Sequence, residues 1–300
     1  MKHALPLLAL ALLLAATPAY SQKKKSTGPK PLRGLYITVD AGLLIPSDKQ
    51  ADFYSGRPEC PNSLMRVLHS EQYGTQIWNS LVEQGAISPS AIPSYRAFNV
   101  DEYASMYFKL TYQLGVGFRN VGSSGWGWLA RFDFSQLTAA GQFLLSSNNG
   151  TGILGSDRYV RCDIFGLEKR IFIDLGIAKR IPLTETLDFE FNVGFDVNNT
   201  KVSENAIRIA GHTYSILDVW NGETPYPGIG TYEYINDGAM GIGAFGTVAL
   251  SWRVPMGAID FGYTCYNIQT KYRRYNENDC YALQHNFLFR FNLNNFKLFD

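Results

Sequence analysis

The chain has 300 residues and nearly balanced charge, with 27 Lys and Arg against 26 Asp and Glu. Aromatic residues are frequent, with 19 Phe, 18 Tyr and 5 Trp, and mean hydropathy is slightly negative at −0.12. This balance lacks the basic footprint of a nucleic-acid-binding protein, and it is typical of amphipathic strands joined by polar loops.

The N-terminal segment 1–21 has the organisation of a cleaved secretory signal peptide. Lys2 precedes a short apolar run, and a pattern of small residues around one tyrosine ends at Ser21. We therefore predict cleavage between Ser21 and Gln22. A membrane anchor is the alternative, but the run is shorter than the roughly 18 apolar residues that a spanning helix needs.

After the signal peptide, the dominant pattern is strict alternation of apolar and polar residues. Residues 187–197, for example, read LDFEFNVGFDV. Side chains alternate faces along a strand, so each such segment predicts a β-strand with one apolar face. Eight segments have this pattern: 34–45, 104–120, 126–145, 158–181, 187–199, 239–254, 258–272 and 281–299.

Short and long connections alternate between these segments. The short ones contain turn residues, and the long ones lie near 46–103, 147–157, 200–237 and 273–280. An up-and-down arrangement would place all short turns at one end and all long loops at the other. This organisation predicts an all-β fold, an eight-stranded antiparallel up-and-down transmembrane β-barrel with long extracellular loops.

Which face lies inside distinguishes two architectures. A soluble barrel has an apolar interior, whereas a membrane barrel has an apolar exterior. Lys169 and Lys179 bracket an apolar row on one face, and the 11-residue span from 169 to 179 matches a strand that crosses a bilayer. Tryptophans and one phenylalanine near the short turns suggest an aromatic girdle: Trp126, Trp128, Trp252 and Phe299.

The membrane arrangement directs the charged residues of the strands into the barrel. Both signs occur, so we predict a lumen of paired ions with a structural role. The predicted ion network comprises Asp40, Lys109, Arg131, Asp133, Arg170, Asp174, Asp188, Glu190, Asp260 and Arg290. Glycines on the same face would leave room for these side chains.

The chain resembles the small bacterial outer-membrane barrels of the OmpA and OmpX type. The resemblance covers nearly the whole mature chain as a pattern. Its closest motif is HNFLFRFNLNNFKLF at 285–299, which is similar to the aromatic-rich terminal strand that the barrel-assembly machinery reads in that family; here Asp300 follows. The resemblance implies a cell outer-membrane location, a short periplasmic segment at 22–33 and a barrel over 34–300.

These observations favour a non-enzymatic membrane scaffold that presents loops 46–103 and 200–237 for adhesion or for binding an extracellular or envelope protein. The expected partners also include outer-membrane lipid and the barrel-assembly machinery, but no nucleic acid. One alternative is a narrow gated pore through the charged lumen. Another is a lipid-modifying enzyme centred on His285, which falls on the apolar face near the outer end of the last strand.

Other local patterns have weaker implications. Gly241-Ile-Gly243-Ala-Phe-Gly246 matches GxGxxG but lies within a predicted strand, so no nucleotide or other cofactor is expected. Residues 63–84 have helical spacing that ends near Gly85, and we predict one or two helices in the first long loop. Cys60 and Cys280 are the preferred disulfide pair because both lie in predicted loops. The cysteine and histidine spacing indicates no metal site.

Overall fold

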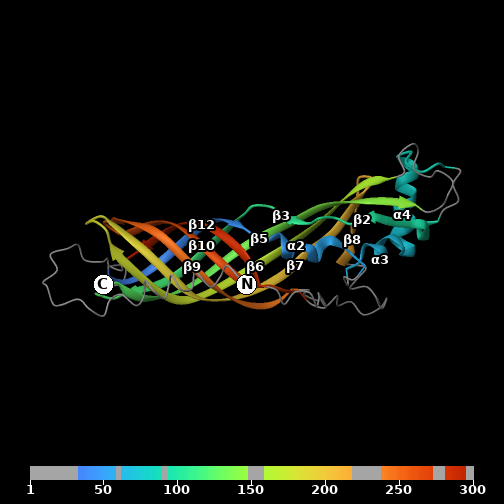
Figure 1. Ribbon diagram of the computed structural model, residues 1–300. Helices are drawn as coiled ribbons and strands as arrows, with labels where there is room; N and C mark the ends of the chain where they lie inside the picture. Colours follow the sequence, from blue (N-terminus) through green and yellow to red (C-terminus); the bar gives the residue numbers. More distant parts are fainter. Residues whose placement is uncertain are drawn as a thin grey trace, which may run out of the picture. The chain divides into compact units, whose positions relative to one another are not determined.

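A closed ring of eight antiparallel strands organises the part of the chain that the computed structural model describes, which comprises residues 33–58, 62–89, 94–147, 159–217, 238–272 and 281–294 (Figure 1). In pairing order the ring strands are β1 (Gly34–Ile45), β4 (Thr111–Val121), β5 (Trp126–Ser147), β6 (Val160–Pro182), β7 (Leu187–Ile209), β9 (Gly238–Val254), β10 (Gly257–Gln269) and β12 (Tyr281–Leu293). Each strand pairs with the next one along the chain, and β12 pairs with β1. The predicted fold class is therefore confirmed.

Further elements lie at the long-loop end of the ring. They are α2 (Asp48–Ala51), η1 (Asp52–Ser55), α3 (Leu64–Leu68), α4 (Glu71–Glu83), η2 (Tyr95–Ala97), β2 (Phe98–Glu102), β3 (Tyr107–Phe108), β8 (His212–Ser215) and β11 (Lys271–Tyr272). α3 and α4 confirm the helices predicted at 63–84. Ser70 accepts a hydrogen bond from the Tyr73 amide at the start of α4, and Gly85 follows its end with φ of +73°. No helix in the described ranges is long and apolar enough to cross a membrane.

The ring has its apolar side chains outside and its polar side chains inside. Large hydrophobic residues face outward on every ring strand; among the most exposed are Leu43, Phe118, Phe132, Leu175, Phe195, Ile242, Phe261 and Phe287. The alternate residues are buried and mostly polar or charged. We call the outward apolar zone the belt. In β6 the belt runs from Ile171 to Ile181, which is the length needed to cross a bilayer.

Along the three longest strands, β5, β6 and β7, the apolar side chains change from the outward face to the inward face. In β5, Phe132 is 46% exposed and the neighbouring Arg131 is buried, as in a membrane barrel. Farther along the same strand, Phe143 is 1% exposed on the inward face, and Gln142 is exposed on the outward face. The upper part of β5 therefore has the polarity of a soluble protein and lies beyond the belt.

We call this second zone the cap: residues 62–89, 94–102, 137–147, 160–168 and 200–217. In Figure 1 β5, β6 and β7 extend past the other ring strands toward α3 and α4. The cap has a conventional apolar core that includes Leu68, Ile77 and Leu81, each fully buried. The Trp78 and Phe98 rings lie 5.8 Å apart in this core.

Two predicted boundaries were wrong. The segment 104–120 is not one strand, because β4 begins only at Thr111 and β3 is a separate pair of residues. The predicted loop 200–237 begins as strand, since β7 continues to Ile209 and turns into β8. Ala210 and Gly211 form this turn with φ of 52° and 79°, the left-handed backbone of a two-residue hairpin.

Several predictions fall outside the described residues. These are the signal peptide with its cleavage point at Ser21, the periplasmic segment apart from Arg33, the Cys60–Cys280 disulfide and the aromatic residue Phe299. They stay predictions.

Candidate functional site

The barrel interior is filled by charged side chains that meet across the ring. Near the short turns, Glu190 on β7 contacts Arg119 on β4, Arg180 on β6 at 3.0 Å and Arg290 on β12 at 3.1 Å. Asp260 on β10 lies 3.6 to 3.8 Å from the same three guanidinium groups. All five side chains are at most 2% exposed. Strands from most of the ring circumference are thus tied together at one point.

We call this group of charges near the short turns the lower layer, and two further contacts complete it. Asp40 on β1 is 2.5 Å from the Nε atom of Arg290, which balances three arginines with three carboxylates. Asp188 accepts a 3.0 Å hydrogen bond from the Nε atom of Arg253 at the short-turn end. The Tyr36 ring lies under the Arg180 guanidinium at 5.7 Å and is fully buried.

A middle layer centres on Arg131. Its guanidinium contacts Asp133 at 2.8 Å, donates to Asp174 at 3.0 Å and donates to the Tyr266 hydroxyl at 2.6 Å. Tyr266 comes from β10, on the other side of the ring, and its hydroxyl also donates to Asp174 at 3.1 Å. Gln113 on β4 donates to both Asp133 and Tyr266, at 2.9 and 3.2 Å.

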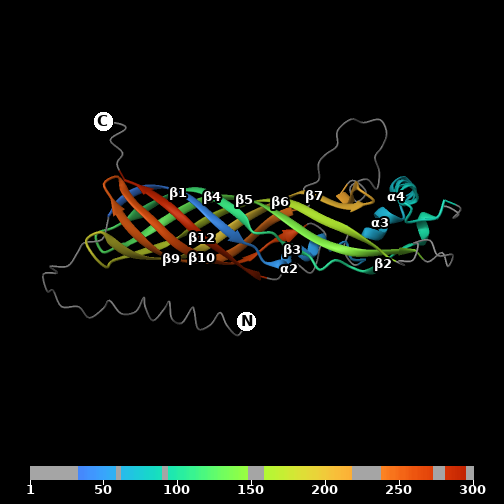
Figure 2. The same cartoon turned by 90° about the horizontal axis from the view of Figure 1, so that it is seen from above.

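An upper layer is formed where α2 and η1 enter the mouth of the ring, close to β3 (Figure 2). Glu168 contacts Arg170 at 2.5 Å and accepts hydrogen bonds from the hydroxyls of Tyr54 and Tyr272, at 2.6 and 2.8 Å. Gln50 of α2 accepts from Arg170 at 2.8 Å. We call residues 48–55 the plug, because their buried side chains fill the lumen at the long-loop end.

Tyr54 of the plug and Tyr272 of β11 are held in their neutral form. Burial, and next the charge of Glu168, raises the pKa of Tyr54 well above its ordinary value. Burial and the same carboxylate raise the pKa of Tyr272 well above its ordinary value. Both hydroxyls are therefore hydrogen-bond donors over the whole physiological range, as their bonds to Glu168 require.

Small residues make this filled interior sterically feasible. A Cβ atom at Gly115 would lie 1.6 Å from the Oδ1 atom of Asp133. At Gly194 it would lie 2.8 Å from the ring of Phe245, which is the cross-strand partner of Tyr266. The inward glycines therefore provide space for larger neighbours, as the sequence suggested.

The structure brings together all of the predicted ion network except Lys109. The other nine residues are buried: Asp40, Arg131, Asp133, Arg170, Asp174, Asp188, Glu190, Asp260 and Arg290. Lys109 is exposed, because it precedes β4 and its amide bonds to Thr138 rather than continuing the strand alternation. Its assignment to the lumen is therefore corrected.

Four ion-pairing residues were missed: Arg119, Glu168, Arg180 and Arg253. On its strand, each of the four lies on the inward face, two or more residues beyond the last inward residue that the sequence analysis predicted. Following the alternation to the ends of β4, β6 and β9 would have identified them. Tyr54 of the plug had no such signal, because Tyr54 and Glu168 are 114 residues apart.

The belt rim at the short turns is aromatic and basic. Trp126, Trp128 and Trp252 are all exposed there. Lys179 lies 4.8 Å from the centre of the Trp126 ring and donates a 2.9 Å hydrogen bond to the Ser124 carbonyl. This is the arrangement expected where a barrel meets a membrane interface.

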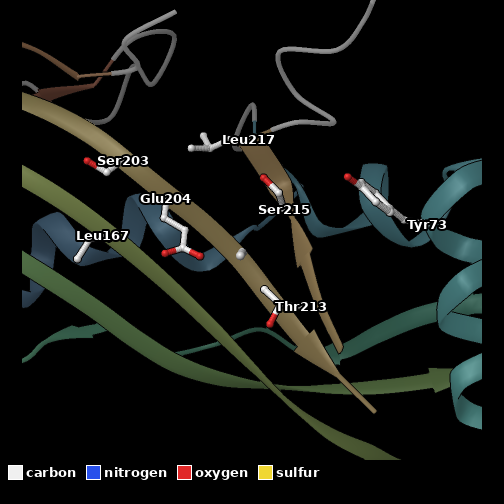
Figure 3. Close-up of a pocket in the computed structure, with 8 residues that line it drawn as sticks. Tyr73, Leu167, Ser203, Glu204, Thr213, Ser215 and Leu217 are labelled. Carbon is white, nitrogen blue, oxygen red and sulfur yellow. The ribbon is translucent and has the colours of Figure 1, made fainter. Parts of the chain in front are cut away.

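The cap contains a polar pocket of about 400 Å³ (Figure 3). Its lining combines hydroxyl groups, one carboxylate and apolar side chains: Tyr73, Leu167, Ser203, Glu204, Ala206, Thr213, Ser215 and Leu217. β6, β7 and β8 supply most of this lining, and Tyr73 comes from α4. The Glu204 carboxylate has no hydrogen-bond or ion-pair partner among the described residues.

The remaining reactive groups give no catalytic arrangement in the described ranges. The Nδ1 atom of His285 shares a 2.5 Å hydrogen bond with the Tyr263 hydroxyl. Burial raises the pKa of the Cys162 thiol to about 12, which keeps it protonated and unreactive. The described residues include no cluster of three metal-ligand side chains. The GxGxxG match at 241–246 lies within β9, as predicted.

The comparisons with known proteins find a likeness among solved structures. No family profile matches the sequence, and no curated protein matches it. Among solved structures, the chain is similar to Ail, the attachment invasion locus protein of Yersinia pestis, in complex with the heparin analogue sucrose octasulfate. The identity is 10%, the TM-score is 0.33, and the alignment covers 87% of this chain and 100% of that chain.

Glu190→Gln should destabilise the barrel strongly. The substitution leaves three buried arginines with two carboxylates, and breaking a buried pair on one side costs about 3–5 kcal/mol. Urea unfolding in lipid vesicles measures the difference. Glu83→Gln, at the exposed end of α4, is the control and should change the free energy of unfolding by less than about 0.5 kcal/mol. Equal effects of the two substitutions would contradict the role of Glu190.

The plug should lose stability only at alkaline pH. The unfolded chain ionises Tyr54 near pH 10, whereas the folded chain does not, so folding loses stability as the pH rises above 10. The stability difference between the wild type and Tyr54→Phe should stay constant from pH 6 to 9 and shrink at pH 11. Urea titrations at these values test it. A constant difference at pH 11 would show that Tyr54 ionises freely in the folded protein.

Proposed function

We propose that this protein is an outer-membrane scaffold of the OmpA and OmpX type that holds the cap at the cell surface for adhesion or partner binding. The exchange of polarity along β5 carries the proposal. The same strand has an apolar outward face at Phe132 and a polar outward face at Gln142. A single chain therefore spans a membrane with its ring and projects a water-facing domain from one end.

The orientation follows from the chain's ends and turns. A secretory signal would deliver the N-terminus to the periplasm, and β1 begins at the short-turn end of the ring. The cap then faces the outside of the cell. Insertion would require the barrel-assembly machinery, for which the aromatic-rich C-terminal strand is a suitable signal, and the belt would contact outer-membrane lipid.

Bulk transport is not supported by the interior. An eight-stranded barrel has a lumen just wide enough for side chains, and three charged layers and the plug occupy it here. The charges are used for cohesion: each layer joins strands from opposite sides of the ring. The cap, by contrast, offers the pocket beside β8 and a polar outward surface, and this is where we place partner binding.

Filling the pocket should reduce adhesion without affecting assembly. Thr213 is exposed at the pocket, so Thr213→Trp adds a large side chain without disturbing the cap core. Bacteria that display this variant should adhere to host-cell or matrix surfaces about 30-fold less than bacteria that display the wild type, the loss expected for a binding hot spot of about 2 kcal/mol. Counts of adherent cells measure the effect.

Thr75→Trp is the matched control, because Thr75 lies on the exposed face of α4 away from the pocket lining. Surface amounts of both variants are compared with an epitope tag inserted after Pro89, which is exposed and does not line the pocket. A tag that is accessible only after the envelope is opened would contradict the proposed orientation. Equal adhesion by the wild type, both variants and cells without the protein would contradict the adhesive function.

A further inference from the structure

Two lysines with the same orientation lie directly opposite each other on neighbouring strands. Lys169 of β6 and Lys201 of β7 are cross-strand partners, and both are exposed on the outward face. Among the described residues neither ammonium group has a hydrogen-bond or ion-pair partner. Like charges directly opposite in a sheet are destabilising, so this pair needs a compensating anion to be favourable.

The lysine pair lies at the cap-side rim of the belt. The next outward-facing cross-strand pair toward the belt is Ile171 with Asn199, and the belt of β6 begins at Ile171. Lys109, also exposed, lies two strands away at a similar level, since its amide bonds to Thr138 and Thr138 pairs with Leu167.

Within the described ranges, the outward neighbours of the pair do not neutralise it. Gln136 of β5 is the cross-strand partner of Lys169 on its other side and carries no charge. Glu204 is the nearest outward carboxylate along β7, and it forms no ion pair with either lysine among the described residues. It lines the pocket of the cap instead.

At the opposite rim of the belt, by contrast, a lysine has protein partners. Lys179 lies on the same strand and the same face as Lys169, and it contacts the Trp126 ring and the Ser124 carbonyl. In the part of the chain that the structure describes, the lysines at the cap-side rim have no such protein partners. In a membrane, the groups at this level are lipid headgroups, whose phosphates match an ammonium pair in charge.

We propose that Lys169 and Lys201 form a binding site for the phosphate group of a membrane lipid in the leaflet next to the cap. The two flexible side chains can converge on one phosphate monoester from adjacent strands, with the Gln136 amide beside them. The apolar belt below the pair receives the acyl chains. This inference rests on the proposed membrane placement of the ring.

The test uses the full chain folded in phosphatidylcholine nanodiscs that contain a few per cent phosphatidic acid. Native mass spectrometry measures how much phosphatidic acid stays bound. At about fivefold per lysine, the Lys169→Gln, Lys201→Gln double variant should bind about 25-fold more weakly than the wild type. Lys179→Gln removes one charge from the same strand at the other rim and should change binding less than twofold.

Lys201→Glu separates binding from stability. It creates opposite charges across the strands, so the free energy of unfolding should not fall, yet lipid retention should fall as in the double variant. Retention that is equal in all variants, or lost equally in Lys179→Gln, would overturn the site. Inorganic phosphate that binds the wild type in detergent as tightly as phosphatidic acid would also overturn it, because the free ion would then be the ligand.

The nanodiscs also separate this inference from the proposed function. A wild-type chain that inserts, with its ring protected from protease, but does not select phosphatidic acid would refute only the lipid site. A chain that fails to insert would refute both.

Discussion

The structure depends on one constraint, which is that a membrane-crossing ring must present apolar side chains outward and therefore places its charges in a narrow interior. Buried charges are costly unless each one is paired. The lower layer meets this requirement by gathering Arg119, Arg180 and Arg290 around Glu190, with Asp40 and Asp260 completing the balance. Because these residues come from six different strands, the same contacts that neutralise the charges also hold the ring closed.

The cap shows the opposite solution on the same strands. Beyond the belt, the inward face of β5 becomes apolar and shares one hydrophobic core with α3 and α4, and water replaces lipid on the outward face. The change from an inward Ser135 to an inward Leu137 is thus a boundary between two solvents. The contacts of Glu168 with Arg170, Tyr54 and Tyr272 lie where the charged lumen ends and the apolar core begins. The plug fills the lumen at this point, and the bonds from Tyr54 to Glu168 and from Arg170 to Gln50 join it to β6 at the base of the cap.

Much of this organisation could be predicted from the sequence, because alternation is a local signal. Every ring strand was located, and the spacing from Lys169 to Lys179 identified the belt in β6. The misses have physical causes. The alternation predicts that β7 ends near residue 199, whereas the strand continues to Ile209. The cause is a register shift opposite Leu167 and Glu168, which interrupts the alternation. Lys109 was placed in the lumen because the start of β4 has no turn residue to mark it. The bond from Tyr54 to Glu168 joins distant segments, which periodicity cannot detect.

Spin-label scanning of β5 tests the central claim most directly. Single cysteines, introduced one at a time from 128 to 144 in a background without the native cysteines, would carry a nitroxide whose contact with oxygen and with a water-soluble nickel complex is measured in lipid vesicles. We predict oxygen contact at the even positions up to 134 and nickel contact at the even positions from 138 upward, with neither at most odd positions. Nickel contact at the even positions along the whole strand would contradict a membrane-spanning ring and would indicate a soluble barrel.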